Sequence, residues 1–190
     1  MSWDEDLRQH LRVELEPDAQ PEAQSSVLAL IGQEKQSGKE QILLMKRTMT
    51  VETHKGQLCF PGGYREKHDK DLLATALRET EEEIGVAPGD ITVLGRLKPV
   101  YTRNEVLITP WVGRLDFPYP FKLNDAEVER LIFLPVDRLV GEGLKPVTAN
   151  VGVVRVSSIG MTIDGDLLWG ATARMLEELR QYLLKFWVTA

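Results

Sequence analysis

Residues Gly62 to Val86 read GGYREKHDKDLLATALRETEEEIGV and contain the most regular helical pattern of this chain. Four of them recur at the spacing i, i+4, i+7 and i+11, namely Leu73, Leu77, Thr80 and Ile84. Gly85 follows, and glycine commonly ends a helix because it adopts the left-handed conformation without strain. The pattern predicts a helix over residues 71–84 that follows a glycine-rich turn.

Acidic residues crowd one edge of this predicted helix. At about 100° per residue, the side chains of Glu79, Glu82 and Glu83 fall within roughly one quadrant, whereas Glu81 points elsewhere. Like charges at these spacings repel one another. An acidic run is often only a solvated helix face, but a hard divalent cation such as Mg²⁺ prefers such carboxylate oxygens. Arg78 can pair with Glu82 one turn away.

Length and composition restrict the class of protein. The 190 residues suit one domain, and the formal charge of −6 disfavours nucleic acid and membrane surfaces as partners. Cys59 is the one cysteine, so we expect no internal disulfide, and the histidines are too scattered for a metal trio. An acidic amino terminus and the lack of a long apolar run favour the cytoplasm.

The order of the remaining patterns predicts one mixed α/β domain. Residues 1–24 are interpreted as a helical arm, patterned over 3–14, with a polar and proline-broken linker; residues 25–190 form the domain. Apolar runs predict strands over 27–31, 41–45, 91–97, 106–115, 130–134 and 151–163. A helical turn is expected over 135–140 and a helix over 172–186, whose Leu/Met stripe suits the core or a homodimer face.

The Gly62–Val86 segment resembles the Nudix box, whose pattern is G-x5-E-x7-R-E-U-x-E-E-x-G-U. The second half fits from Arg78 to Val86 if Thr80 is accepted as the apolar U residue. In the first half, Asp69 replaces Glu and the spacer to Arg78 has eight residues. Both departures are similar to the branch of Nudix enzymes that resembles coenzyme A pyrophosphatases.

An upstream segment extends this resemblance. The branch pattern L-L-T-x-R-S-x3-R-x3-G-x3-F-P-G-G aligns without gaps from Leu43 to Gly63, with Arg47 and Gly56 at the expected places. Glu52 stands where the pattern has its second Arg. This charge reversal keeps open other nucleoside diphosphate compounds as substrates.

The resemblance implies an α/β/α sandwich in which a mixed sheet supports a loop-helix-loop motif. It implies Mg²⁺ or Mn²⁺ held by Glu79, Glu82, Glu83 and a backbone carbonyl of Gly62, with Arg78 orienting the glutamates. Glu83 or Glu127, with Glu129 as a rival, would act as the general base. Phosphate and substrate contacts are expected from Arg47, Lys55, Gly63 and Arg103, although surface basic residues are often only solvated.

The implied reaction is hydrolysis of the diphosphate bond of a small nucleotide. For coenzyme A or its derivatives the products would be 3',5'-ADP and a 4'-phosphopantetheine compound. ADP-ribose, dinucleotides and nucleotide sugars are alternative substrates. A third hypothesis is a Nudix-like domain that binds nucleotides and regulates a partner without hydrolysis. The intact set of acids disfavours this hypothesis.

Overall fold

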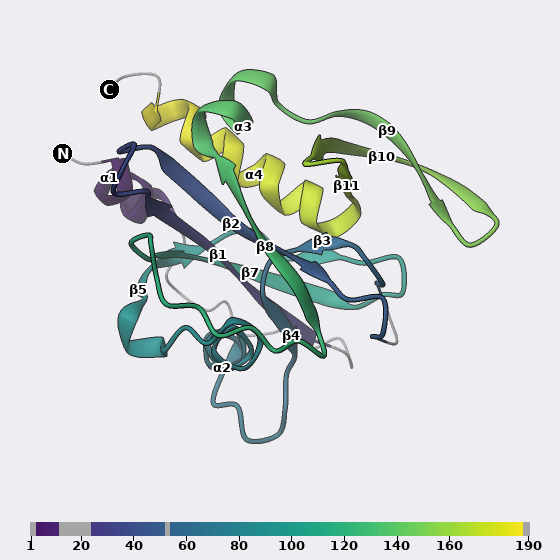
Figure 1. Ribbon diagram of the computed structural model, residues 1–190, viewed down its shortest axis with the longest axis horizontal. Helices are drawn as coiled ribbons and strands as arrows, with labels where there is room; N and C mark the ends of the chain where they lie inside the picture. Colours follow the sequence, from purple (N-terminus) through teal and green to yellow (C-terminus); the bar gives the residue numbers. More distant parts are fainter. Residues whose placement is uncertain (1–2, 12–23, 52–53, 188–190) are drawn as a thin grey trace.

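A computed structural model describes residues 3–11, 24–51 and 54–187 of the chain. A mixed sheet lies at its centre, with helix α2 (Leu72–Ile84) against one face and α4 (Gly170–Trp187) against the other (Figure 1). The predicted α/β/α sandwich is therefore confirmed.

The central strand β1 (Gln24–Gln33) organises the main sheet. It pairs in parallel with β7 (Leu107–Arg114) and antiparallel with β2 (Glu40–Arg47), which makes the sheet mixed. The principal order is β3-β2-β1-β7-β5, where β3 is Leu58–Cys59 and β5 is Thr92–Arg96. Three further strands join this sheet: β4 (Gly62–Tyr64) on β1, β6 (Val100–Tyr101) on β7, and β8 (Val128–Pro135) on β2.

Strand β1 is buried on both faces, which explains its unbroken apolar run. Successive strand residues point to opposite faces, so Ala29 packs in the core beneath α4 whereas Leu28 and Leu30 pack in the core beneath α2. The strand also begins earlier than predicted. Gln24, assigned to the linker, lies in β1.

A second sheet was only partly predicted. One strand was expected over 151–163, but the chain forms the antiparallel strands β9 (Lys145–Val151), β10 (Val154–Ile163) and β11 (Asp166–Trp169). Strand β9 is mostly exposed and contains Pro146, so it carries little of the apolar alternation that marks a half-buried strand. The predicted turn after β8 is helix α3 (Val136–Glu142), and a short 3-10 helix, η1, spans Pro88–Asp90.

The N-terminal arm contributes to the core. Helix α1 (Trp3–His10) contacts α4 and β5, and Leu7 and Leu11 are buried with the side chains beneath α4. The linker predicted after this helix falls mainly on residues 12–23, outside the described residues, so the proposed division at residues 24 and 25 stays a prediction.

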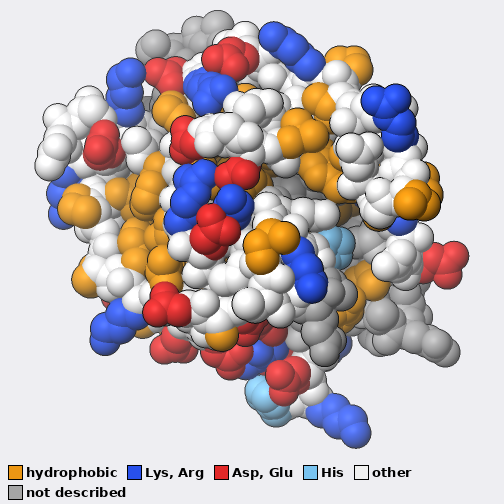
Figure 2. Space-filling view, turned by 45° about the vertical axis from the view of Figure 1, so that its right-hand side comes forward, with side chains coloured by type: hydrophobic (Ala, Val, Ile, Leu, Met, Phe, Trp, Pro, Cys, Tyr) orange, Lys and Arg blue, Asp and Glu red, His pale blue; other side chains and the backbone are white. Residues whose placement is uncertain are grey.

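The surface in Figure 2 carries both signs of charge. Acidic and basic side chains lie interspersed on this face, with hydrophobic side chains between them. Among the described residues, no helix has the length and apolar character needed to cross a membrane.

Candidate active site

Helix α2 has well-defined ends. The Asp71 side chain accepts a hydrogen bond from the Ala74 N–H at 2.8 Å, which caps the first turn. Gly85 is left-handed, with φ of 71°, and donates its N–H to the Glu81 carbonyl. The helix predicted over 71–84 is therefore confirmed to within one residue.

The buried face of α2 differs from the predicted one. Leu73 and Leu77 are only partly buried, whereas the buried set is Leu72, Thr75, Ala76, Thr80, Glu83 and Ile84. On an ideal helix this face is centred roughly 75° closer to the acidic edge than the apolar pattern predicts. Glu83 consequently lies within the buried face and not beside it.

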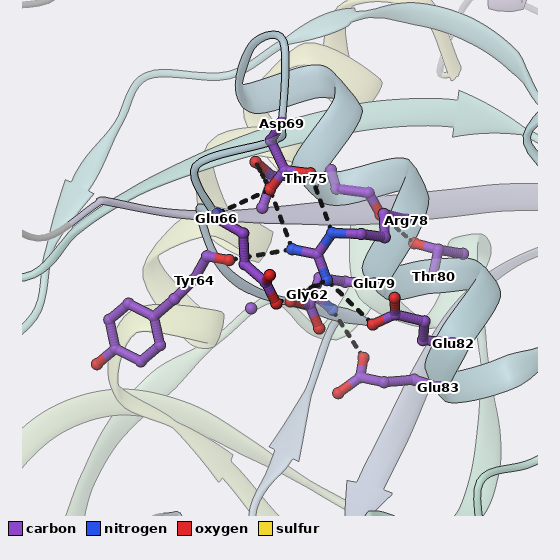
Figure 3. Close-up of polar contacts among 12 residues, drawn as sticks. Gly62, Tyr64, Glu66, Asp69, Thr75, Arg78, Glu79, Thr80, Glu82 and Glu83 are labelled. Atoms are coloured by element: carbon purple, nitrogen blue, oxygen red, sulfur yellow. Dashed lines mark hydrogen bonds and ion pairs between the residues drawn. The ribbon is translucent and has the colours of Figure 1, made fainter.

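Asp69 joins the preceding loop to α2 through Arg78 (Figure 3). The Arg78 Nε and Nη2 atoms donate to the two carboxylate oxygens of Asp69, each at 3.0 Å. Asp69 also accepts from the Thr75 hydroxyl at 3.0 Å and from the Glu66 N–H at 2.9 Å. The hydrogen bonds from Arg78 hold the pKa of Asp69 well below its usual range although burial opposes this.

The same guanidinium contacts the acids of the helix. Its Nη1 atom donates to Glu79 Oε1 at 2.9 Å and to Glu82 Oε2 at 3.0 Å, and its Nη2 atom donates to the Tyr64 carbonyl at 3.2 Å. Figure 3 shows Asp69 on one side of Arg78 and the glutamates on the other. Arg78 therefore contacts both Glu79 and Glu82, as its predicted orienting role requires, and the role itself stays a prediction.

Gly63 leaves space for the Glu79 carboxylate. A Cβ atom on Gly63 would lie 2.5 Å from Glu79 Cδ, closer than real contacts allow. Burial raises the pKa of Glu79, and the adjacent Arg78 opposes that shift. The glycine pair thus lets the loop backbone approach the acidic edge directly.

Among the acids of α2, Glu83 is the most enclosed, with 2% of its side chain exposed. Its Oε2 atom accepts from the Gly62 N–H at 2.8 Å, and its Oε1 atom lies 3.3 Å from Arg47 Nη1. Burial raises the pKa of Glu83 to about 8, with Glu79 and Glu127 adding to the rise; the Gly62 N–H and Arg47 oppose it. Glu83 therefore lies close to other acidic side chains at a position that little water reaches.

Arg47 connects two candidate general bases. Its Nη1 atom contacts Glu83, and its Nη2 atom lies 3.7 Å from Glu127 Oε2. Glu127 itself directly precedes β8 and accepts from Asn124 Nδ2 at 3.3 Å. Glu129, the rival base, instead pairs with Lys46 at 3.1 Å. Lys46 also contacts Asp166 in β11, which packs on the α4 side, so Glu129 lies away from the acids of α2.

The remaining candidate contacts lie on turns. Lys55 is exposed between β2 and β3, in the turn that follows Arg47. Arg103 is exposed between β6 and β7, and β7 begins opposite Gln24, next to the loop that carries Gly63. Glu52 lies outside the described residues. The predicted substrate roles of these residues stay predictions.

Aromatic residues after β7 anchor the loop that leads toward β8. The Phe121 ring packs against those of Phe117 and Tyr119, and Phe117 also meets Phe133 edge-on at 5.1 Å between ring centroids. The Tyr119 hydroxyl donates to Asp90 at 2.7 Å. These contacts give the three aromatic residues a packing role.

The donor chemistry of the acids fits a hard divalent cation. Glu79, Glu82 and Glu83 offer carboxylate oxygens, and the raised pKa values of Glu79 and Glu83 mark a place where added positive charge is favourable. In the described part of the chain, no three His, Cys, Asp or Glu side chains already converge on a metal position. Arg78 and Arg47 instead contact the carboxylate oxygens that a cation would use.

Comparison with known proteins agrees with this geometry. Residues 23–151 match the NUDIX domain, which covers more than half of the chain. The protein therefore belongs to the Nudix family and is a Nudix hydrolase. Nudix hydrolases generally use divalent metal ions and act on small nucleotide substrates.

Two relatives refine this placement. The chain is 33% identical over 150 residues to NudL of Photorhabdus laumondii, an uncharacterized Nudix hydrolase, covering 75% of this chain and 77% of that protein. It is 39% identical over 100 residues to the peroxisomal coenzyme A diphosphatase NUDT7 of Mus musculus, covering 53% of this chain and 42% of that protein. These relatives are consistent with the branch that resembles coenzyme A pyrophosphatases.

The NUDIX domain of Shewanella oneidensis NrtR, solved with ADP ribose, is similar in fold. Its TM-score is 0.54 at 18% identity, over 90% of this chain and 94% of that chain. This likeness extends over most of both chains and concerns the fold alone.

Proposed function

We propose that this Nudix hydrolase cleaves the diphosphate bond of coenzyme A or its derivatives, releasing 3',5'-ADP and a 4'-phosphopantetheine compound. The observation that carries the diphosphatase chemistry is the buried Glu83 carboxylate, seated on the Gly62 N–H beside Glu79 and Glu82. The choice of substrate is supported by the Leu43–Gly63 pattern and by the similarity to the coenzyme A diphosphatase of mouse.

In this proposal Glu79, Glu82, Glu83 and the Gly62 carbonyl hold Mg²⁺ or Mn²⁺. When bound, such a cation supplies the positive charge that a diphosphate and its departing phosphate require. Arg78 keeps the glutamates oriented, because Asp69 holds its guanidinium from the opposite side. Glu82, with 56% of its side chain exposed, has the most freedom to turn toward a ligand.

Glu127 takes the proton from the attacking water. Its side chain is 42% exposed, so water can reach it, whereas Glu83 is nearly enclosed and suits a ligand role. Arg47 lies between the two acids, and a cation that replaces it at Glu83 would leave its guanidinium available to a phosphate. Lys55, Arg103 and the backbone of Gly63 complete the proposed substrate contacts.

A substrate panel tests the proposal. The purified chain is incubated with coenzyme A, acetyl-coenzyme A, ADP-ribose, a diadenosine polyphosphate and a nucleotide sugar, each with Mg²⁺ or Mn²⁺, and the products are identified by mass. We expect the highest kcat/KM for a coenzyme A compound. Glu81→Gln is the matched control, because Glu81 is exposed on the same helix and should leave turnover unchanged.

Glu52 favours a second candidate within the same chemistry. An acid at the position of the pattern's second Arg would weaken binding of a strongly anionic ligand. A kcat/KM for ADP-ribose above that for every coenzyme A compound would establish this alternative. Binding without product from any compound would instead support a regulatory, non-hydrolytic domain.

A further inference from the structure

Strand β4 lies in the segment before α2 and contacts the edge of α2 that carries Arg78, Glu79 and Glu83. The Gly62 N–H donates to Glu83, the Gly63 Cα packs against the Glu79 carboxylate, and the Tyr64 carbonyl accepts from Arg78. Three consecutive residues therefore set the positions of three side chains on the helix. The contacts that fix the position of β4 therefore also fix the positions of these side chains.

The strand is attached to the sheet by its pairing with β1. Ser25, Ser26 and Val27 lie opposite Tyr64, Gly63 and Gly62, respectively. A side chain adds to this backbone pairing, because the Ser25 hydroxyl donates to the Gly63 carbonyl at 2.8 Å. Ser25 is 8% exposed, so water competes little for this hydrogen bond.

The Ser25 bond adds to the contacts that orient one peptide unit. The Gly63 carbonyl belongs to the peptide plane that leads into Tyr64. The pairing of Gly63 with Ser26 holds this plane through the backbone, and the Ser25 hydroxyl is a second, side-chain donor to the same carbonyl. A rotation would shift Gly63 against Glu79 and turn the Tyr64 carbonyl away from Arg78. The apolar pattern of β1 does not explain the serine, because the next residues on the same face of the strand are Val27, Ala29 and Ile31.

We propose that Ser25 is a positioning residue of the hydrolase site, acting through the Gly63 carbonyl to hold Glu79 and Arg78 in the arrangement that receives a divalent cation. Ser25 touches neither substrate nor cation in this role. The inference rests on the proposed cation role of the acids and goes beyond it by assigning a function to a residue of the opposite strand.

Ser26 provides a matched control. It is the next residue of β1 and is also buried, but its hydroxyl donates to the Thr109 carbonyl of β7 at 3.2 Å, away from the loop. Ser25→Ala and Ser26→Ala each remove one buried hydroxyl and its hydrogen bond. If the hydroxyls only stabilise the fold, both variants should behave alike at the site.

The test measures Mn²⁺ affinity without turnover, from the electron paramagnetic resonance signal of free Mn²⁺. Loss of one buried hydrogen bond corresponds to about a fivefold change in an equilibrium constant. We therefore expect Ser25→Ala to weaken Mn²⁺ binding about fivefold and Ser26→Ala to leave it within about twofold of the wild type. Ser25→Thr should retain the wild-type affinity because threonine keeps the hydroxyl. Thermal unfolding midpoints show that each variant is folded.

The outcomes separate this inference from the proposed function. Wild-type protein that binds no Mn²⁺ refutes the cation role of the acids, and the Ser25 inference with it. Wild-type protein that binds Mn²⁺ while Ser25→Ala binds it equally well refutes the role of Ser25 alone. Equal weakening in Ser25→Ala and Ser26→Ala assigns Ser25 a merely structural role and likewise overturns the inference.

Discussion

Replacing Asp69 with asparagine removes a negative charge that faces Arg78 and keeps the size of the side chain. In the wild type, 3% of the Asp69 side chain and 17% of the Arg78 side chain are exposed, and two hydrogen bonds of 3.0 Å join them. Breaking a buried ion pair by removing one partner costs about 3–5 kcal/mol. Asp69 lies in the loop before α2, and the Arg78 side chain on α2 is partly exposed, so we expect about 3 kcal/mol, the low end of this range.

The expected loss depends on pH with a definite sign. The folded pKa of Asp69 is lowered, and the unfolded value is about 3.9. The stabilisation is therefore fully present above pH ~4 and is lost as pH falls through the folded pKa. The free energies of unfolding of wild type and Asp69→Asn should differ most at pH 7 and converge below pH ~4.

Urea unfolding measures this difference directly. With a slope of about 2 kcal/mol/M, a loss of about 3 kcal/mol lowers the urea midpoint by about 1.5 M at pH 7. Asp125→Asn, at an exposed loop position, is the control and should leave the midpoint unchanged. A loss below about 0.5 kcal/mol at pH 7, or a gap that stays constant down to pH 3, would refute the role given to the Asp69–Arg78 pair.

Further predictions concern the acids and the cation. Glu83→Gln should lower kcat about 100-fold or more in a folded protein, and near-wild-type turnover would remove Glu83 from the mechanism. Gly63→Ala places a Cβ 2.5 Å from Glu79 Cδ and should lower both Mn²⁺ affinity and kcat about tenfold; unchanged values would contradict the packing argument. Glu127→Gln should reduce kcat about 100-fold and Glu129→Gln less than twofold, and the reverse order would exchange their roles. EDTA should abolish product release and Mg²⁺ or Mn²⁺ should restore it; turnover that persists in EDTA excludes the cation role.

Helix α2 could be predicted because its signals are local. Periodicity, the acids on one edge and the terminating Gly85 all lie within about four turns of one helix. The two apolar runs around Leu28 and Leu43 likewise predicted strands β1 and β2, which pair with each other. Exposed β9 and the two-residue strand β6 gave no comparable signal, because neither has a continuous buried face.

The positions of the acids relative to the loop could not be predicted from local pattern. Glu83 is buried because β4 pairs with β1 and brings the Gly62 N–H to it across 21 residues of sequence. The contact between Arg47 and Glu83 spans 36 residues and depends on β2 lying in the same sheet. Periodicity places a side chain on a helix edge, but only tertiary pairing decides whether that edge is enclosed.

The charge balance of the completed site favours a cation over a purely structural network. The guanidinium of Arg78 engages Nε, Nη1 and Nη2, so its five N–H donors meet five acceptor contacts: two with Asp69 and one each with Glu79, Glu82 and the Tyr64 carbonyl. Among the described residues, six carboxylates lie within 3.8 Å of Arg78 or Arg47, and the two arginines would leave four of these negative charges uncompensated if all were ionised. They are Glu66, Asp69, Glu79, Glu82, Glu83 and Glu127.

Two arginines cannot neutralise this set, and burial together with the neighbouring acids raises the pKa of Glu83 to about 8, which favours its protonated form. A divalent cation would compete with this proton, since metal ligands must be deprotonated. Cation binding to this chain near pH 7 should therefore release protons, which a purely structural network of ion pairs has no reason to do.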